Sequence, residues 1–376
     1  MSALKALCIT GLLAMAAAGC TAGTTELSPK GLAAAAEAGD ANAQLELGVM
    51  YDTGRGVPQD SALAVSWYRK AAAQGNAAAQ ANLGYSFAEG RGVAEDDAEA
   101  VAWYRKAVAK GNAAAQFYLG LMYARGGNGM SQDYAEAARW YRKAAEQGLA
   151  NAQGELGVMY SRGQGVPQDD AEAVSWFHKA AAQGNLTAQM NLGTSYATGK
   201  GIARDNTEAA SWYRKAAEQG YAKAQSNLGY MLSEGIGVRQ DSIQSVSWYR
   251  KAADQGYASA QYDLGYLYRH GRGLPRNNAE AVSWYRKAAA QGYAPAQADL
   301  GIMFATGDGL PHKAIPAYAL LSLSISTKES TPDNAIPARE KLLATMTNQQ
   351  VAAGDRLTRR MLAEGVLVAL DSEGSK

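Results

Sequence analysis

Tryptophan recurs at a nearly constant interval through most of this 376-residue chain. Each of the seven tryptophans opens a segment similar to Trp67-Tyr68-Arg69-Lys70-Ala71-Ala72. Successive tryptophans lie 36 residues apart, with one interval of 37; they are Trp67, Trp103, Trp140, Trp176, Trp212, Trp248 and Trp284. A fixed period of this size is typical of solenoids, in which each repeat buries its apolar face against its neighbours. The period therefore predicts one continuous array, although the length alone would favour two or three domains.

Each repeat reads as two helices joined by a glycine turn. In residues 76–111, apolar residues recur at helical spacing until Gly90 ends the first helix. Asp96 and Glu99 then stand three residues apart, which is the spacing of a capping box at the start of a second helix. We favour this role over acid–base catalysis or calcium binding, because no loop supplies the alternating oxygen ligands of a calcium site.

A glycine recurs inside every first helix. A glycine there costs about 1 kcal/mol relative to alanine, so its recurrence predicts a shared steric reason. We expect the missing side chain to make room for the Trp or Tyr of the paired helix, and Gly193→Leu to lower thermal stability. The glycines each follow a leucine; they are Gly48, Gly84, Gly120, Gly157, Gly193, Gly229, Gly265 and Gly301.

The recurring pattern closely resembles the Sel1-like repeat, a relative of the tetratricopeptide repeat. Residues 149–184 carry it at Ala152-Gln153, Leu156-Gly157, Tyr160, Gly163, Gly165-Val166, Asp169, Ala173, Trp176, Lys179-Ala180-Ala181 and Gly184. The resemblance implies an all-α fold, in which helix–turn–helix units stack into a right-handed α-α superhelical solenoid with a concave groove. It also implies an adaptor for macromolecular complexes, including those of the bacterial envelope.

Eight repeats are expected within residues 40–328, at 40–75, 76–111, 112–148, 149–184, 185–220, 221–256, 257–292 and 293–328. The extra residue of the third repeat predicts a bulge in its glycine-rich turn, at Gly126, Gly127 and Gly129. Residues 21–39 are expected to form a spacer and an N-terminal capping helix. Residues 329–376 are expected to form two capping helices, 333–346 and 348–363, followed by a tail from Asp371.

Residues 1–20 read as an export signal. Lys5 precedes an apolar run that is too short to span a bilayer as a stable helix. The segment Ala17-Ala18-Gly19-Cys20 resembles a bacterial lipobox, although family practice prefers Leu where Ala17 stands. The resemblance implies lipidation of Cys20 and an outer-membrane lipoprotein facing the periplasm. The alternative is an ordinary signal cut, which would leave a soluble periplasmic or secreted protein.

Composition excludes several classes of function. The formal net charge is +1, and Lys and Arg are mixed with carboxylates, so nucleic-acid binding is not expected. The two cysteines both precede the repeats, which excludes Cys-ligated metals and Cys nucleophiles from the array. The three histidines fit no metal motif and no nucleophile–base pair. We therefore expect no enzyme, no cofactor and no metal.

The variable positions of the first helices are the candidates for the partner-binding groove, because family geometry places these helices on the concave side. They combine aromatic side chains, which act as anchors at interfaces, with amides and acids. Packing between neighbouring repeats is the alternative role for each one. The candidates are Asn82, Tyr85, Phe117, Tyr118, Met190, Asn191, Asn227, Tyr230, Tyr262, Asp263, Tyr266 and Asp299.

The first hypothesis for function is a non-enzymatic envelope adaptor that binds a partner peptide or helix. The second is an envelope scaffold that contacts polysaccharide or peptidoglycan, because tyrosines and amides also stack on sugars. A β-lactamase-like hydrolase is third, since some cysteine-rich relatives are linked to that activity. This chain lacks their paired cysteines, and its one Ser-x-x-Lys sequence, Ser2 to Lys5, lies inside the signal.

Overall fold

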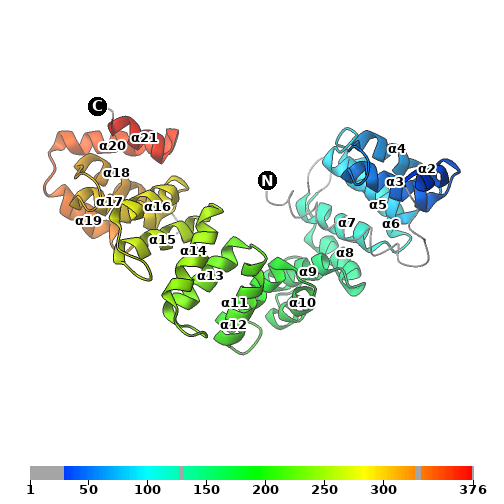
Figure 1. Cartoon of the computed structure of the whole chain (residues 1–376), viewed down its shortest axis with the longest axis horizontal. Helices are drawn as coiled ribbons and strands as arrows, with labels where there is room; N and C mark the ends of the chain where they lie inside the picture. The colour runs from blue at the N-terminus through cyan, green and yellow to red at the C-terminus, as the bar shows by residue number, and fades with distance from the viewer. Residues whose placement is uncertain (1–28, 127–130, 327–331, 375–376) are drawn as a thin grey trace. The chain divides into compact units, whose positions relative to one another are not determined.

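The computed structural model of the chain describes residues 29–126, 131–326 and 332–374. In these ranges the secondary structure is helical, without a strand (Figure 1). The helices are α2 (Pro29–Glu37), α3 (Ala41–Thr53), α4 (Ser61–Ala73), α5 (Ala77–Glu89), α6 (Asp97–Val108), α7 (Ala113–Arg125), α8 (Tyr134–Glu146), α9 (Ala150–Arg162), α10 (Asp170–Ala182), α11 (Leu186–Thr198), α12 (Asn206–Glu218), α13 (Ala222–Glu234), α14 (Ser242–Asp254), α15 (Ala258–His270), α16 (Asn278–Ala290), α17 (Ala294–Thr306), α18 (Ala314–Ser326), α19 (Ala335–Leu343), α20 (Asn348–Glu364) and α21 (Val366–Gly374).

The chain divides into two compact units, residues 1–188 and 189–376, and the boundary falls within α11. In the first unit the paired helices are α3 with α4, α5 with α6, α7 with α8, and α9 with α10. In the second they include α13 with α14, α15 with α16, and α17 with α18. Each second helix also contacts the first helix of the following repeat within its unit, as α4 does with α5 and α14 with α15. The expected helix–turn–helix organisation is confirmed.

The second helices begin at the predicted capping residues, but the reciprocal half of the capping box is wrong. The Asp96 carboxylate accepts a hydrogen bond from the Glu99 backbone N–H at 3.0 Å. The Asp96 backbone N–H, however, donates to the carbonyl of Phe87 on the preceding helix at 2.9 Å. That donor is therefore unavailable to the Glu99 side chain. The same cross-helix bond recurs in other repeats, as from Asp169 to Tyr160.

The recurrent glycines make room for an aromatic ring of the paired helix. A Cβ built on Gly193 would lie 2.6 Å from two ring carbons of Tyr213, well inside ordinary contact distance. In the seven repeats that contain a tryptophan, the partner is the residue after it, which is Tyr in six of them and Phe177 beside Gly157. In the eighth repeat the partner is Leu321 beside Gly301. The predicted steric reason is therefore confirmed, and Tyr rather than Trp is the large residue accommodated.

Each tryptophan instead lies beneath a lysine of its own helix. The ammonium of Lys70 is 3.7 Å from the centroid of the Trp67 ring, and the other six tryptophans are covered in the same way at up to 4.2 Å. Such cation–π contacts add to the burial of the indole. Trp284, for example, packs against a core cluster that contains Leu264 and Leu267 of its own repeat and Tyr249 of the preceding one.

Buried glutamines connect neighbouring repeats. The side-chain amide of Gln225 donates to the backbone carbonyl of Ala217 on the preceding helix at 3.0 Å, and the carbonyl oxygen of Gln225 accepts from Gln255 at 2.8 Å. The same arrangement holds for Gln153 and Gln261. Each glutamine thus adds a second donor to a helix-end carbonyl that already accepts a backbone N–H, as the Ala217 carbonyl does from Gly220 at 3.0 Å.

The C-terminal segment contains one helix more than predicted. Beyond α19 and α20, α21 extends to Gly374, so the tail expected from Asp371 begins inside a helix. The Asp371 carboxylate pairs with Arg286 of α16, which ties this helix to the array. The predicted bulge falls at residues 127–130, outside the described residues. No helix in the described part of the chain is long and apolar enough to cross a bilayer.

Candidate binding surface

Three candidate groove residues of the first unit form a buried aromatic cluster. Tyr85, Phe117 and Tyr118 are 6%, 8% and 6% exposed. The ring centroid of Tyr118 lies 5.5 Å from that of Tyr85 and 5.4 Å from that of Phe117. Aromatic pairs at this separation stabilise a core beyond their buried area. These side chains therefore join α5 to α7 and do not line an open groove.

Two of the candidate asparagines contact tyrosines of the preceding repeat. Asn82 hydrogen-bonds the hydroxyl of Tyr68, and Asn227 hydrogen-bonds that of Tyr213, each on the second helix of the preceding repeat. The Asn227 amide also lies 4.0 Å from the sulfur of Met190, which is buried. These three candidates therefore support the contact between repeats. Asn191 is half-buried and has no such contact of its own among those described.

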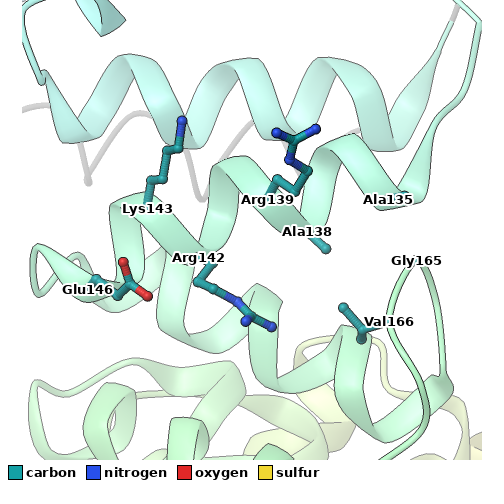
Figure 2. Close-up of a pocket in the computed structure, with 8 residues that line it drawn as sticks. All are labelled: Ala135, Ala138, Arg139, Arg142, Lys143, Glu146, Gly165 and Val166. Atoms are coloured by element: carbon teal, nitrogen blue, oxygen red, sulfur yellow. The ribbon is translucent and has the colours of Figure 1, made fainter.

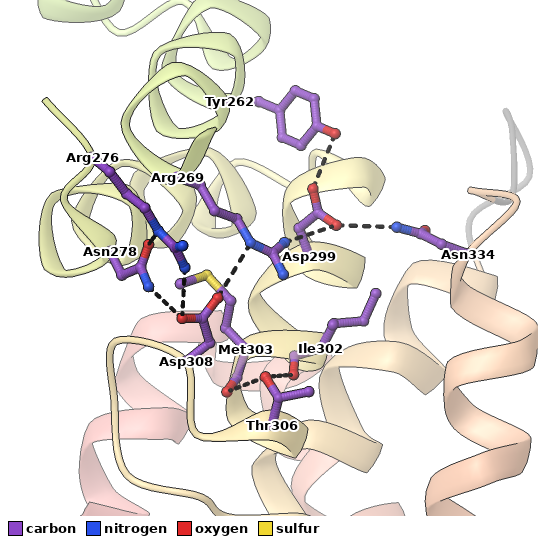
Figure 3. A network of polar contacts seen from close by, with 10 residues as sticks. All are labelled: Tyr262, Arg269, Arg276, Asn278, Asp299, Ile302, Met303, Thr306, Asp308 and Asn334. Atoms are coloured by element: carbon purple, nitrogen blue, oxygen red, sulfur yellow. Dashed lines mark hydrogen bonds and ion pairs between the residues drawn. The ribbon is translucent and has the colours of Figure 1, made fainter. Parts of the chain in front are cut away.

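Two further candidates belong to a polar network in the last repeats (Figure 3). Asp299 is buried; it accepts hydrogen bonds from Tyr262 at 3.1 Å and Asn334 at 3.0 Å. Its carboxylate lies 3.6 Å from the Arg269 guanidinium, which is also 3.6 Å from Asp308. These partners offset the free-energy cost of burying the Asp299 carboxylate. Asp299 thus joins α15, α17 and the start of α19.

A related ion pair occurs in the first unit with its charges exchanged. Asp52 and Arg91 lie 39 residues apart, as Arg269 and Asp308 do, and their side chains meet at 2.9 Å. Burial raises the pKa of the Asp52 carboxyl, and the Arg91 charge partly offsets that effect. Ion pairs at this position therefore connect successive repeats, and they are structural.

The accessible candidates are on α13 and α15. Tyr230 is 54% exposed, which is unusual for a tyrosine in a close-packed array. Tyr266 is half-buried, and its ring centroid lies 4.2 Å from that of His270. Asp263 is half-buried as well, and burial raises the pKa of its carboxyl to about 7, against a smaller lowering by a hydrogen bond with Ser259. These three residues therefore remain available to a ligand.

Three more tyrosines, which the sequence analysis did not single out, begin the first helices of the second unit. Tyr221, Tyr257 and Tyr293 are the N-cap residues of α13, α15 and α17, and none makes a side-chain capping bond. Asn76 and Asn112 hold the same position in the first unit and do cap their helices. Loss of such a cap costs about 0.5–2 kcal/mol per helix. The sequence could have indicated these tyrosines, because the N-cap position of the first helix changes from Asn in the first unit to Tyr in the second.

A pocket lies on α8 in the first unit (Figure 2). It is an open pocket of about 410 Å³ with an apolar floor that includes Ala138 and Val166. Arg139, Arg142 and Lys143 stand at its edge. Arg139 is paired with Glu136 at 2.6 Å, while Arg142 contacts a tyrosine hydroxyl and Lys143 covers Trp140. The cations of this pocket already have partners within the chain.

The comparisons with known proteins place the chain in a family. The Sel1 repeat family matches at residues 41–76, 77–112, 113–149, 150–185, 186–221, 222–257, 258–293 and 294–325. The chain is a Sel1-repeat protein. The expected resemblance and the number of repeats are confirmed, with boundaries one residue later than predicted at most positions. Proteins with this repeat are typically helical scaffolds for protein–protein interaction rather than catalysts.

Two solved structures are similar over most of the Sel1-repeat chain. One is the protective antigen c5321 of uropathogenic Escherichia coli, which displays an SLR fold; it is 30% identical, with 92% of this chain and 89% of that chain covered and a TM-score of 0.58. The other is a Sel1 repeat protein from Oxalobacter formigenes, 35% identical, with coverage of 83% and 90% and a TM-score of 0.60. They support the α-solenoid fold. No curated protein matches the chain.

Neither catalysis nor a metal centre finds support in the described residues. No group of three or more His, Cys, Asp or Glu side chains within ranges 29–126, 131–326 and 332–374 is placed to hold a metal ion. His270 is exposed, and partial desolvation together with nearby Arg269 and Arg272 lowers its pKa. Cys20, the predicted lipidation site, lies outside the described residues and stays a prediction.

Proposed function

We propose that this Sel1-repeat protein is a non-enzymatic scaffold of the bacterial envelope, which binds an extended segment of a partner protein along the first helices of residues 189–374. Exposed Tyr230 carries the proposal. Its ring is 54% exposed, whereas its counterpart Tyr85 is buried. Aromatic side chains that remain in water are typical anchors of protein interfaces.

The neighbouring repeat supports the same surface. Tyr266 stands at the equivalent position of α15, and Tyr257 and Tyr293 begin α15 and α17. Tyrosine provides a large contact area with few rotatable bonds, and its hydroxyl can bond to a peptide backbone. Repeats that display such side chains at a fixed period suit an extended ligand.

The test is site-specific photocrosslinking in intact cells. A photoreactive amino acid in place of Tyr230 is expected to capture a distinct protein, while the same residue in place of exposed Ser175 on α10 provides the control. Capture of a protein by the Tyr230 variant alone supports the scaffold function. Failure to capture a protein there, with glycan recovered instead, would refute it in favour of the second candidate.

That second candidate is a scaffold for polysaccharide or peptidoglycan. Tyrosine rings and amides at a regular spacing also stack on sugars, and Tyr230 with half-buried Asn191 supplies both chemistries. It predicts that soluble glycan protects Tyr230 from chemical modification. Protein partners that compete for the same ring would argue against it.

We further propose that the protein is exported and anchored through a lipid on Cys20. The lipobox-like sequence before Cys20 supports this assignment. Acyl chains contribute about 0.8 kcal/mol of membrane affinity per buried methylene, so a multiply acylated cysteine would anchor the chain firmly. Incorporation of labelled palmitate that is lost in Cys20→Ala is the expected result. Equal labelling of both proteins would contradict it.

A further inference from the structure

The pocket on α8 lies between one face of that helix and a turn of the next repeat. Its α8 residues recur at helical spacing, so they project from the same side; they are Ala135, Ala138, Arg139, Arg142, Lys143 and Glu146. The turn that joins α9 to α10 contributes Gly165 and Val166 (Figure 2). The pocket is therefore built from two successive repeats of the first unit. We call it the α8 pocket.

The apolar part of the α8 pocket is fixed by packing. A Cβ built on Gly165 would lie 2.0 Å from the backbone carbonyl oxygen of Tyr134, so the turn lies directly against the start of α8 with no room for a side chain. Val166 is half-buried against the core of the first unit, and Ala138 is buried. The apolar floor is thus largely preformed, as is usual for ligand sites.

The third repeat differs from the others at one position of this face. Arg139 directly precedes a tryptophan, whereas the other six tryptophan-containing repeats have Ser there in five cases and Ala102 in one. Arg142 and Lys143 follow the general pattern of the repeat. The face therefore carries three cations within about 6 Å of helix length, where the equivalent faces carry at most two.

The positive charge of the α8 pocket is mostly not neutralised. Arg139 pairs with Glu136 at 2.6 Å, but exposed pairs of this kind contribute little and exchange readily. Arg142 and Lys143 contact a tyrosine hydroxyl and a tryptophan ring, which are neutral, and no ion pair among the described residues includes either cation. Glu146 is the one carboxylate in the lining. The pocket thus favours an anion.

We propose that the α8 pocket binds an acidic segment of a partner protein, in which a Glu or Asp side chain lies beside an apolar one. A guanidinium has five N–H donors, so Arg139 and Arg142 keep donors for a carboxylate, and Ala138 with Val166 can cover the apolar side chain. The volume of about 410 Å³ is within the usual range for ligand sites. This surface is additional to the one around Tyr230, and it goes beyond the function proposed above.

Glu146 and the shape of the pocket favour a peptide over an anionic membrane. Glu146 lies on the same face as Arg139, about 10 Å further along the helix, where it would repel a surface dense in phosphate groups. A single acidic side chain can approach Arg139 and Arg142 without meeting Glu146. The site is also a hollow, which a side chain can enter more easily than a flat layer of headgroups can.

The probe is a fluorescent peptide of about ten residues that repeats Ser-Leu-Glu, titrated against the full chain by fluorescence anisotropy. Arg139→Ser installs the residue of most other repeats and should weaken binding about fivefold or more, because a charge opposite to that of the ligand is lost. Ala135→Glu places a carboxylate one turn before Arg139 and should weaken binding at least as much. Both positions are exposed, and thermal melting checks that each variant is folded.

The helix α12 provides a matched control. It has the same Arg-Lys pair, Arg214 and Lys215, and the same following acid, Glu218, but Ser211 stands where α8 has Arg139. Arg214→Ser removes one exposed positive charge and should bind the peptide like the wild type. Peptides with Gln in place of Glu, or with Ser in place of Leu, should bind weakly to all of these proteins.

Equal affinity of the wild type and Arg139→Ser for the Glu peptide would overturn the proposal, and so would an equal loss in Arg214→Ser. Absence of binding to the wild type, or equally tight binding of the Gln peptide, would overturn it as well. If vesicles of phosphatidylcholine and phosphatidylglycerol bind the wild type but not Arg139→Ser, and the peptide binds neither, the pocket faces a membrane and the proposal is wrong. Crosslinking at Tyr230 tests a different surface, so its outcome is independent of these results.

Discussion

Substitution of Gly157 by alanine tests the steric reason for the recurrent glycine. A Cβ at Gly157 would lie 2.6 Å from Cε1 and 2.7 Å from Cδ1 of Phe177, and 3.2 Å from the carbonyl oxygen of Ala173. Carbon atoms in contact normally lie about 3.5–4.0 Å apart, so the ring must move by about 1 Å. Phe177 is 3% exposed, so a shift of its ring displaces the packed side chains around it.

Two effects of opposite sign decide the outcome. Alanine gains about 1 kcal/mol over glycine in a helix interior. Overpacking of a closed core costs about 1–3 kcal/mol, and an overlap of this size with a ring and a backbone carbonyl belongs at the upper end. We expect Gly157→Ala to lower the free energy of unfolding by about 1–2 kcal/mol net, measured as the urea midpoint by circular dichroism.

Gly154 provides a matched control on the same helix. A Cβ there would lie 3.3 Å from Oδ1 of Asn185, so this oxygen, which also accepts from the Ala188 N–H, needs to move by only a few tenths of an ångström. Gly154→Ala should therefore be neutral or gain up to about 1 kcal/mol. Phe177→Leu should recover part of the loss when combined with Gly157→Ala. If Gly157→Ala stabilises the protein as Gly154→Ala does, the steric argument is refuted.

Three further outcomes are expected. Gln225→Ala removes one donor to the Ala217 carbonyl and the acceptor of the Gln255 amide, so it should lower stability by about 1–3 kcal/mol and speed amide exchange at the ends of α12 and α13; unchanged exchange would contradict this. Tyr85→Ala should cost about 3 kcal/mol or more in a melting experiment, whereas Tyr230→Ala should stay within about 0.5 kcal/mol; similar losses would show that both rings are structural. The folded pKa of Asp263, about 7, exceeds the ordinary value of 3.8, so its stabilising protonation is complete below about pH 4 and is lost as pH rises through 7. Between pH 5 and pH 8 the wild type should therefore lose roughly 2–3 kcal/mol more stability than Asp263→Asn, and parallel melting curves would argue against the raised pKa.

The helix–turn–helix architecture was predictable because the same sequence pattern recurs in every repeat. The helix boundaries follow from glycine turns such as the one at Gly90 and from capping residues such as Asp96. Both signals act on backbone groups only a few residues away in the sequence. The capping-box prediction was wrong because the Asp96 N–H donates to the carbonyl of Phe87 on another helix, so it is not available to the Glu99 side chain. The third C-terminal helix was missed because residues beyond the array have no repeat to support an inference.

The candidate surface was only partly predictable. Equivalent positions were named correctly as variable, but most of the residues at them are buried or bonded to a neighbour. Asp299 and Met190 show this, since one joins a network of side chains and the other lies under Asn227. Variation between repeats marks both binding residues and residues that adapt to a particular neighbour.

The sequence by itself determined the period, the two helices of each repeat and the need for space at the glycine, because these depend on short-range chemistry that recurs every 36 residues. The tertiary structure alone decided which tyrosines meet solvent. Tyr85 and Tyr230 occupy the same repeat position, yet they are 6% and 54% exposed. The neighbour 33 residues later is Tyr118 in the first case, whose ring packs on Tyr85, and the shorter Asp263 in the second. The burial of Tyr85 thus depends on a ring of the next repeat, which lies 33 residues away in the sequence.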